Sequence, residues 1–361
     1  MLKTAPIVFA VEDTYQIVVP VNAECLMWVQ IGDKTYYDDT NGILRSLSDV
    51  HRVTVPMAAL DAAKEYTVYL RPVTLRRGWC SQTEEPIAYT YPFIPVPTQG
   101  ARAYCISDSH GRIEEPVAAA KAYGDIDFLI LNGDLANSFD DPDQLLNACR
   151  LAERLTGGSK PVVSARGNHD LRGKYSEQTA LYMPQCHGHT YFTFRFGSVW
   201  GLVLDCGEDK RDDHVECGHV FCCRAFREKE TDYLREVIRR AEQEYAAEGV
   251  TTRVLIAHFP FAYKRWADYN LEEDIYAEWC RLLREEIRPD LWICGHMHVT
   301  DVWEVGCPQD TFGQACPILL SGVPGDGYYA GCGYTFGDTA VEATHNDNSG
   351  AVLRQTVITL T

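Results

Sequence analysis

From residue 101 onward, short apolar runs alternate along the chain with longer amphipathic stretches. The apolar runs have the length of β-strands and cover 104–107, 128–131, 162–165, 199–204, 254–257 and 291–294. The amphipathic stretches between them have the spacing of helices and cover 141–155, 224–245 and 272–287. This alternation predicts an α/β domain, and the short strands and Gly-rich turns after Pro317 predict that the tail completes a second sheet.

Residues 1 to about 90 have a different pattern, in which apolar and polar side chains alternate in short runs such as 15–19, 26–30 and 66–70. Such runs, separated by turn residues, predict a small β-sandwich, and 53–73 resembles the end of a fibronectin type III-like domain. The proline-rich passage 91–97 follows, and the fixed φ of proline makes it a semi-rigid connector. We therefore predict an all-β sandwich domain over 1–95 and an α/β domain over 96–361.

Five of the predicted strands end, within a few residues, in side chains that can bind a metal ion. In chain order these groups are Asp108-Ser109-His110, Gly133-Asp134, Gly167-Asn168-His169-Asp170, His258 and Gly295-His296-Met297-His298. Loops at the carboxyl ends of strands in an open α/β sheet converge on one crevice, so these groups are expected to surround one point. In the Asp-X-His and His-X-His pairs, extended backbone would direct both side chains to the same side, and the glycines would let the chain bend where a Cβ would obstruct it.

This ordered set resembles the signature of the calcineurin-like metallophosphoesterases over residues 102 to about 300. The resemblance implies a catalytic domain of two packed mixed β-sheets flanked by helices, a four-layer αββα arrangement. It also implies two divalent metal ions, with Mn, Fe and Zn all suited to imidazole, carboxylate and amide ligands. The implied ligands of one ion are Asp108, His110, Asp134 and His298, and those of the second are Asp134, Asn168, His258 and His296.

The activity that the resemblance implies is hydrolysis of a phosphomonoester or a phosphodiester by a hydroxide that bridges the two ions. His169 would then lie beside the substrate phosphate without binding metal, and would assist the leaving group. Asp170 is the residue that we expect to orient the His169 imidazole, because a carboxylate partner fixes a histidine and raises its pKa.

Purple acid phosphatases combine a β-sandwich with a catalytic domain of this family, but they place a tyrosine three residues after the bridging aspartate and a non-ligand at the position of His110. This chain has Asn137 and His110 at those positions. We therefore do not expect a tyrosinate–iron centre, and we expect Asn137 to hydrogen-bond the ligands instead.

The charge composition limits the classes of substrate that the protein is expected to bind. With 33 Lys+Arg against 51 Asp+Glu, the formal net charge is −18, which disfavours a nuclease, and a small phosphorylated substrate is expected. A scaffold that kept the fold and lost catalysis is a further alternative, although no ligand is missing.

No apolar stretch is long enough to span a bilayer. Of the 14 cysteines, several lie in apolar runs (Cys105, Cys206, Cys294), which favours a reducing compartment such as the cytoplasm over export, the alternative location. The N-terminal domain is expected to contact a partner or the rim of the site.

Three other groups of residues have a functional and an ordinary interpretation. The segment 205–227 carries histidines and cysteines that invite a zinc-finger interpretation, but their spacing is irregular and a solvated loop near the site is favoured. Phe261, Tyr263 and Trp266 either form an apolar wall for the leaving group or pack in the core. Arg166 and Arg172 either meet phosphate or lie on the surface.

Overall fold

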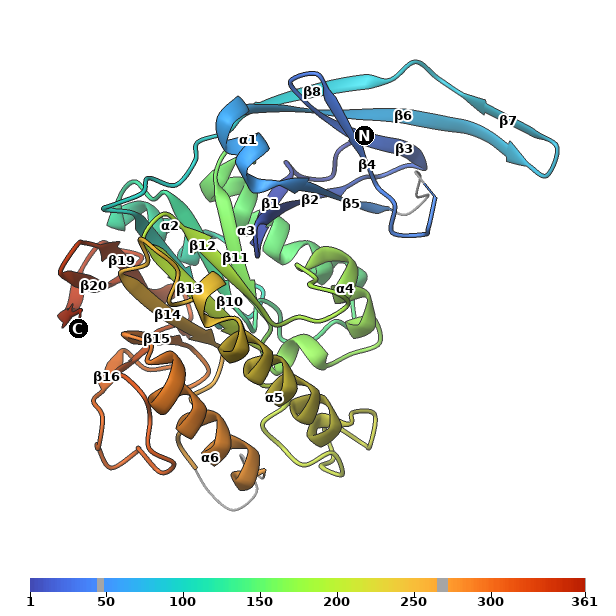
Figure 1. Ribbon diagram of the computed structural model, residues 1–361. Coiled ribbons are helices and arrows are strands. Elements are labelled where there is room, and N and C mark those ends of the chain that lie inside the picture. Colours follow the sequence, from blue (N-terminus) through green and yellow to red (C-terminus); the bar gives the residue numbers. More distant parts are fainter. Residues whose placement is uncertain (44–48, 265–271, 361) are drawn as a thin grey trace.

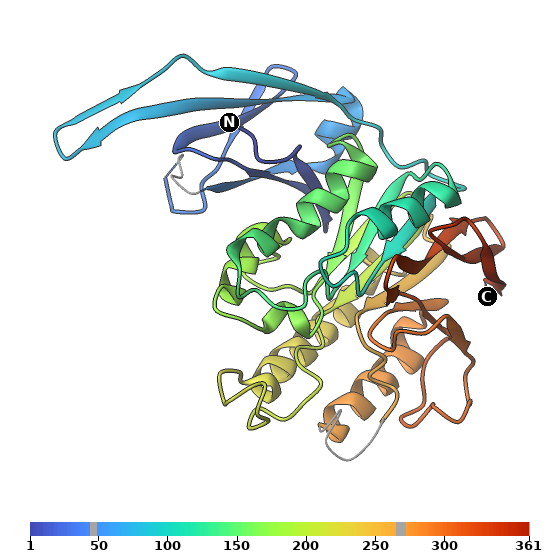
Figure 2. The same cartoon turned by 180° about the vertical axis from the view of Figure 1, so that it is seen from behind.

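Two β-sheets packed face to face form the body of the protein, with helices on their outer faces (Figure 1; the reverse side is shown in Figure 2). The computed structural model describes residues 1–43, 49–264 and 272–360. The predicted four-layer α/β arrangement is confirmed, because one apolar core lies between the sheets and a further core lies under the helices on each side.

The larger sheet has ten strands in the order β21-β20-β19-β9-β10-β11-β1-β2-β5, with β18 pairing β19. Strands β9, β10 and β11 are parallel, and their residues are buried on both faces, as the apolar runs predicted. The strands are β1 Ile7–Val11, β2 Thr14–Pro20, β5 Val50–Pro56, β9 Arg102–Ile106, β10 Phe128–Asn132, β11 Pro161–Ala165, β18 Val323–Gly325, β19 Tyr328–Phe336, β20 Ala340–Asp347 and β21 Val352–Thr359.

The second sheet has six strands in the order β12-β13-β14-β15-β17-β16. Its central strands β13, β14 and β15 are parallel, so their carboxyl ends lie at one edge. The strands are β12 Phe192–Phe196, β13 Val199–Leu204, β14 Thr252–Ala257, β15 Leu291–Cys294, β16 Asp301–Trp303 and β17 Ile318–Leu320.

Helices cover the outer face of each sheet. Residues of α2 and α3 pack on the larger sheet, and residues of α5 and α6 pack on the six-stranded sheet. None of the helices in the described ranges is both long enough and apolar enough to cross a bilayer. The helices are α1 Met57–Ala63, α2 Glu114–Tyr123, α3 Asn147–Thr156, α4 Thr179–Tyr182, α5 Cys223–Arg239 and α6 Glu273–Leu282, with short turns η1 Pro142–Leu146, η2 His169–Leu171, η3 Ser176–Gln178, η4 Ala241–Gln243 and η5 Leu283–Ile287.

The N-terminal region contributes to two sheets. Its own five-stranded sheet has the order β4-β3-β6-β7, with β8 pairing β6, and β3 shows the predicted alternation of buried and half-buried residues. Buried residues of this sheet, such as Val29 and Val68, share a core with Val53 of β5 and Ile17 of β2. The strands are β3 Cys25–Ile31, β4 Lys34–Tyr37, β6 Glu65–Arg77, β7 Cys80–Thr83 and β8 Ile87–Pro92.

A continuous sheet crosses the predicted boundary at residue 95. Strand β1 pairs in parallel with β11, with Val8 opposite Pro161, so β1, β2 and β5 are the end of the larger sheet and one face of the predicted sandwich at the same time. The division of the chain at residue 95 stays a prediction. The N-terminal region also contains α1, which was not predicted because a seven-residue helix spans only two turns and leaves no clear periodic pattern.

Candidate metal centre

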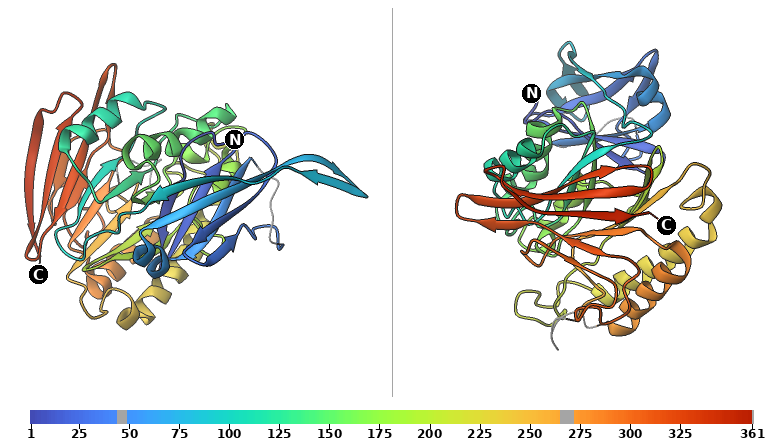
Figure 3. Two further views of the ribbon diagram at one scale, coloured as in Figure 1. Left: turned by 90° about the horizontal axis from the view of Figure 1, so that it is seen from above. Right: turned by 90° about the vertical axis from the view of Figure 1, so that its left-hand side faces the viewer.

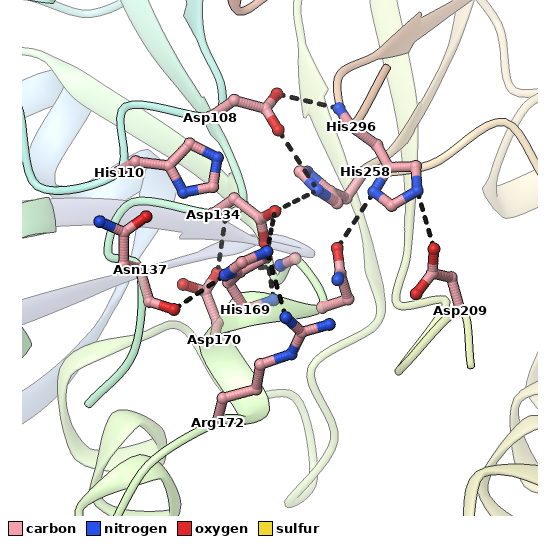
Figure 4. Close-up of polar contacts among 12 residues, drawn as sticks. Asp108, His110, Asp134, Asn137, His169, Asp170, Arg172, Asp209, His258 and His296 are labelled. Carbon is pink, nitrogen blue, oxygen red and sulfur yellow. Dashed lines mark hydrogen bonds and ion pairs between the residues drawn. The ribbon is translucent and has the colours of Figure 1, made fainter. Parts of the chain in front are cut away.

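The predicted ligands follow strands from both sheets and meet at one place between them (Figure 4). Asp108 and His110 follow β9, Asp134 follows β10, and Asn168 follows β11; His258 follows β14, and His296 and His298 follow β15. Three of the four groups found in the described chain, each with ligand atoms within 4.8 Å of one another, lie here: Asp108 with His110 and His298, His110 with Asp134 and His169, and Asp134 with His258 and His296. Asp134 belongs to two of these groups, and through them it is close to His110 on one side and to His258 and His296 on the other, as a residue between two ions would be; His169 is not one of the predicted ligands.

The backbone around the candidate ligands is turned sharply. Asp108, His110, Asp134, His296 and His298 all have positive φ, between 47° and 65°, which costs energy for any residue other than glycine. The expectation that the Asp108–His110 and His296–His298 pairs lie in extended backbone is therefore wrong, because β9 ends at Ile106 and β15 at Cys294, and the chain is already turning. Strain gathered at one place is typical of a functional site, where it is balanced by the surrounding structure.

The glycines have the predicted role. A Cβ on Gly295 would lie 2.5 Å from Oδ2 of Asp108, and a Cβ on Gly133 would lie 2.5 Å from the backbone nitrogen of Gly167. Gly322, which the sequence did not single out, packs just as closely, since its Cβ would lie 2.6 Å from Oδ2 of Asp108. Any side chain at these positions would push the candidate ligands apart.

Each of the two aspartates uses one oxygen to hold the backbone and directs the other inward. Oδ1 of Asp134 accepts a hydrogen bond from the backbone N–H of His169 at 2.8 Å, and Oδ2 of Asp108 accepts one from the N–H of His296 at 2.9 Å. Oδ2 of Asp134 then lies 3.1 Å from Nε2 of His258, and Oδ1 of Asp108 lies 3.2 Å from Nε2 of His298. Both carboxylates are almost fully buried, so charge at the centre is poorly screened.

His258 is held in one orientation. Its Nδ1 lies 2.7 Å from the carbonyl oxygen of Asn132, which accepts a hydrogen bond from Nδ1–H and leaves Nε2 facing the centre. Burial would lower the pKa of His258, but the charges of Asp134 and Asp108 outweigh it and raise the pKa to about 10. A positive charge is therefore favoured at this position between the aspartates.

Asn168 and His296 face each other across the second group. The side-chain amide of Asn168 lies 3.1 Å from Nδ1 of His296 and 3.3 Å from Oδ2 of Asp134. If the amide oxygen points inward, as it must to bind a metal, it meets two atoms that also carry lone pairs. A cation between the three atoms would remove that repulsion.

The donor set fits divalent ions. Buried Oδ1 of Asp108, Nδ1 of His110 and Nε2 of His258 make no hydrogen bond within the described part of the chain, and Nε2 of His110 lies 3.1 Å from Nε2 of His298. Buried polar atoms that make no hydrogen bond are rare and need an explanation, and an ion that they share supplies one. Imidazole, carboxylate and amide oxygen together suit Mn, Fe or Zn.

His169 lies at the edge of this centre and is oriented by its neighbours. Its Nδ1 lies 2.8 Å from the carbonyl oxygen of Asn137, and its Nε2 lies 3.3 Å from NH1 of Arg172 and 4.0 Å from Oδ2 of Asp134. Burial lowers the pKa of His169, against the opposing charge of Asp134. Because Arg172 can only donate, Nε2 is the acceptor and Nδ1 carries the proton.

The expected contact between Asp170 and the His169 imidazole is not made, and this prediction is corrected. Oδ2 of Asp170 accepts hydrogen bonds from the backbone N–H of Gly167 at 2.9 Å and of Asp134 at 3.1 Å, so it ties two ligand loops together. His169 and Asp170 are adjacent in a short helical turn, where neighbouring side chains point in different directions, so their closeness in sequence does not bring the carboxylate to the imidazole. Burial, and then the charge of Asp134, raise the pKa of Asp170 to about 7. Asn137 contacts His169, which is not a predicted ligand, and does so through its backbone carbonyl, so the expected hydrogen bond from Asn137 to the metal ligands stays a prediction.

Two acidic residues at the site were missed, Glu208 and Asp209, which are 0% and 3% exposed. Oδ2 of Asp209 lies 3.1 Å from Nε2 of His296. Glu208 binds Arg172 through Nε at 2.9 Å and NH2 at 3.0 Å, and its Oε1 accepts from Nδ2 of Asn168 at 3.3 Å. The available signal was their position after β13, a predicted strand to which no ligand group had been assigned.

Some of the remaining predicted candidates lie at the site and others do not. Arg172 lies at the site, whereas Arg166 pairs with Asp205 at 2.7 Å. Phe261 is fully buried and packs on Trp292 with ring centroids 4.2 Å apart, so it belongs to the core; Tyr263 packs on Trp303, and Trp266 lies outside the described residues. The segment 205–227 contributes Glu208 and Asp209, and none of its histidines or cysteines joins one of the candidate metal groups found in the described chain.

The contact between Asp209 and His296 leads to a prediction. A carboxylate on the far nitrogen of a ligating histidine fixes its orientation, so Asp209→Asn is expected to weaken metal binding about 10- to 100-fold. Titration of the protein against a competing chelator measures this. Asp213→Asn, which removes an exposed aspartate paired with Arg211 in the same loop, is the matched control. Equal metal affinity in the two variants would show that Asp209 does not support His296.

Comparison with known proteins identifies the family of the chain. Solved structures with the same overall fold include a purple acid phosphatase from yellow lupin seeds, with 13% identity, a TM-score of 0.60, and coverage of 99% of this chain and 75% of that one. A predicted phosphoesterase from Streptococcus pneumoniae also matches, with 13% identity, a TM-score of 0.31, and coverage of 72% of this chain and 97% of that one. No curated protein matches. The profile of the calcineurin-like phosphoesterase family matches residues 101–300, and the chain therefore belongs to this family of phosphoester hydrolases.

Proposed function

We propose that this metal-dependent phosphoesterase uses a dinuclear centre built by the seven predicted ligands. The observation that carries the proposal is the position of Asp134, whose carboxylate is shared by two groups of ligand atoms. Asp108, His110 and His298 would complete one site with Asp134. Asn168, His258 and His296 would complete the other.

The bound ions would supply the nucleophile, because two ions that share a water lower its pKa toward about 7. The protein holds the ligand side chains in position. Asp134 and Asp108 are locked by backbone hydrogen bonds, and His258 is locked by the Asn132 carbonyl, so the donors need little rearrangement when the centre fills.

His169 is proposed to act on the substrate. Its Nε2 faces the centre without being part of the seven-ligand set, and Arg172 lies beside it. A phosphate anion next to the ring would raise the lowered pKa of His169, because negative charge favours the imidazolium. The protonated ring could then donate a proton to the leaving oxygen, while Arg172 stabilises charge on the phosphoryl group.

Two clefts border the centre and are where the organic part of the substrate would lie. One has a volume of about 570 Å³ and runs from His110 past Arg112 and Asn137 to Asp140 and Gln144. The other has a volume of about 700 Å³ and runs from His298 past Tyr328 to Arg354. Both suit a small phosphomonoester or phosphodiester. The net charge of −18 and the acidic lining of the first cleft weigh against nucleic acid.

A reducing compartment, such as the cytoplasm, is part of this proposal. All fourteen cysteines are free, and those singled out from the sequence, Cys105, Cys206 and Cys294, are buried. Burial raises the pKa of each of these three thiols, which keeps them protonated and unreactive.

Removal and return of metal test the proposed function. We expect hydrolysis of aryl phosphate monoesters or diesters that a chelator abolishes and that added Mn, Zn or Fe restores, because the nucleophile depends on the ions. The readout is release of the aryl alcohol, measured together with metal content by elemental analysis. Turnover that is unchanged in chelated protein with no measurable metal would contradict the proposal.

A further inference from the structure

The hairpin of β6 and β7 carries an aromatic and cationic tip. Its turn is Gly78-Trp79, and the side chain of Trp79 is 103% exposed, the highest exposed fraction among the large apolar residues of the described chain. Arg76 and Arg77 precede the turn and are exposed, and neither makes an ion pair with another described residue. Tryptophan and arginine are the residues most enriched at the energetic centres of protein interfaces, so full exposure of this group is unusual for a surface without a partner.

The tip lies far from the rest of the chain. Beyond Pro72, β6 has left β3 and pairs only with β7, and the hairpin projects from the body (Figure 3). Strand β6 has 13 residues, so its tip is about 40 Å from its first residue, Glu65, at roughly 3.3 Å per residue. That distance exceeds the Debye length of about 8 Å at physiological salt, so a partner would meet the charge of the tip and little of the acidic body.

A groove at the opposite end of the hairpin has the complementary chemistry. It has a volume of about 730 Å³ and lies between α1, which directly precedes β6, and strands β12 and β13. Apolar surface comes from Pro56, Met57 and Ala58. Its charged lining residues are Glu12, Asp13, Asp61 and Glu244 against Arg195 and Arg240, four acids and two bases.

Both bases in the groove are already occupied. Arg240 lies 3.3 Å from Glu244 and 4.0 Å from Glu12, and Arg195 donates to the carbonyl oxygens of Gly197 and Glu248. The surplus of two acids matches the two arginines beside Trp79, and the apolar lining residues offer contacts to an indole ring. The charge and the apolar character of tip and groove therefore agree.

We propose that the Trp79 tip of one chain docks in the Glu12–Asp61 groove of a second copy, so that the protein forms a homodimer by reciprocal exchange of hairpins. A chain cannot fill its own groove, because its tip is one hairpin length away from α1. Two hairpins laid antiparallel about a two-fold axis place each tip beside the base of the other, so both grooves fill at once.

The test is the mass of the full-length protein in solution, measured by sedimentation velocity over a series of concentrations. The wild type is expected to approach twice the 40.7 kDa of the single chain, whereas Trp79→Ala and the pair Arg76→Glu with Arg77→Glu stay at 40.7 kDa. Gln82→Ala, an exposed change on the same hairpin away from the tip, is the matched control and should dimerise like the wild type. Because Trp79 is fully exposed, none of these changes should alter the fold, which circular dichroism checks.

Two further variants test the location of the groove. Asp13→Lys should lose dimers alone and regain them when mixed with the Arg76→Glu, Arg77→Glu protein. Treated with the thiol oxidant diamide, which takes up the two electrons and two protons released, Ala58→Cys should form an intermolecular disulfide with exposed Cys80 of another copy, identified by peptide mapping and absent when Cys80→Ser is added. A wild type that stays monomeric at every concentration would overturn the proposal, as would dimers unaffected by Trp79→Ala. Monomers that bind anionic vesicles through Trp79 would instead assign the tip to a lipid surface.

Discussion

Asp134→Asn is expected to reduce phosphoester hydrolysis by about three orders of magnitude or more, the loss that corresponds to several kcal/mol of transition-state stabilisation by metal ions. Asn has the same size as Asp, but it lacks the charge and the second oxygen that a bridging ligand needs. The amide oxygen of the new Asn side chain can still accept a hydrogen bond from the backbone N–H of His169, so the loop should keep its shape. Metal content, measured by elemental analysis, should fall from two ions per chain to one or none.

The matched control for Asp134→Asn is Asp125→Asn, which removes an exposed carboxylate just before the same strand. This control should keep both ions and full activity. Wild-type metal content and turnover in Asp134→Asn would refute the bridging assignment, while unfolding of the variant, seen by circular dichroism, would mark its activity as uninformative and shift the test to Asp108→Asn.

His169→Asn should keep both ions and lower kcat about 100- to 10,000-fold, the range for a positioned proton donor. His169 lies at the edge of the centre, held by the Asn137 carbonyl, and takes no part in the seven-ligand set. The loss should be smaller for aryl esters with acidic leaving groups than for alkyl esters, because a good leaving group needs less protonation. Steady-state kinetics on a series of esters, with metal analysis alongside, measures both effects.

His219→Asn, a change at an exposed histidine outside the centre, controls for the loss of an imidazole. If His169→Asn loses metal as severely as Asp134→Asn does, then His169 is a ligand and its proposed role is wrong. A rate loss that is the same for every leaving group would also contradict proton donation.

The sequence predicted the site better than it predicted the local geometry. The strands that carry the ligands were visible because β10, β11 and β15 are buried on both faces and leave continuous apolar runs. Polar residues at the ends of such runs stand out. The convergence of these strand ends then follows from the parallel arrangement of the strands.

Other features depend on contacts between distant segments and left no local signal. The pairing of β1 with β11 joins residues about 150 positions apart, and alternation along β1 cannot reveal a partner. Asp170 was assigned to its neighbour His169, but its buried carboxylate binds two backbone N–H groups instead. The carboxylate of Asp209 contacts His296, but Asp209 lies in a loop where the histidines and cysteines were the more evident candidate metal ligands.

Anomalous X-ray diffraction from crystals of the manganese-loaded protein, collected at the manganese absorption edge, tests the dinuclear centre most directly. The account predicts two peaks about 3.5–4 Å apart on either side of the Asp134 carboxylate, one near His110 and His298 and the other near His258 and His296. A single peak, or peaks away from Asp134, would contradict it.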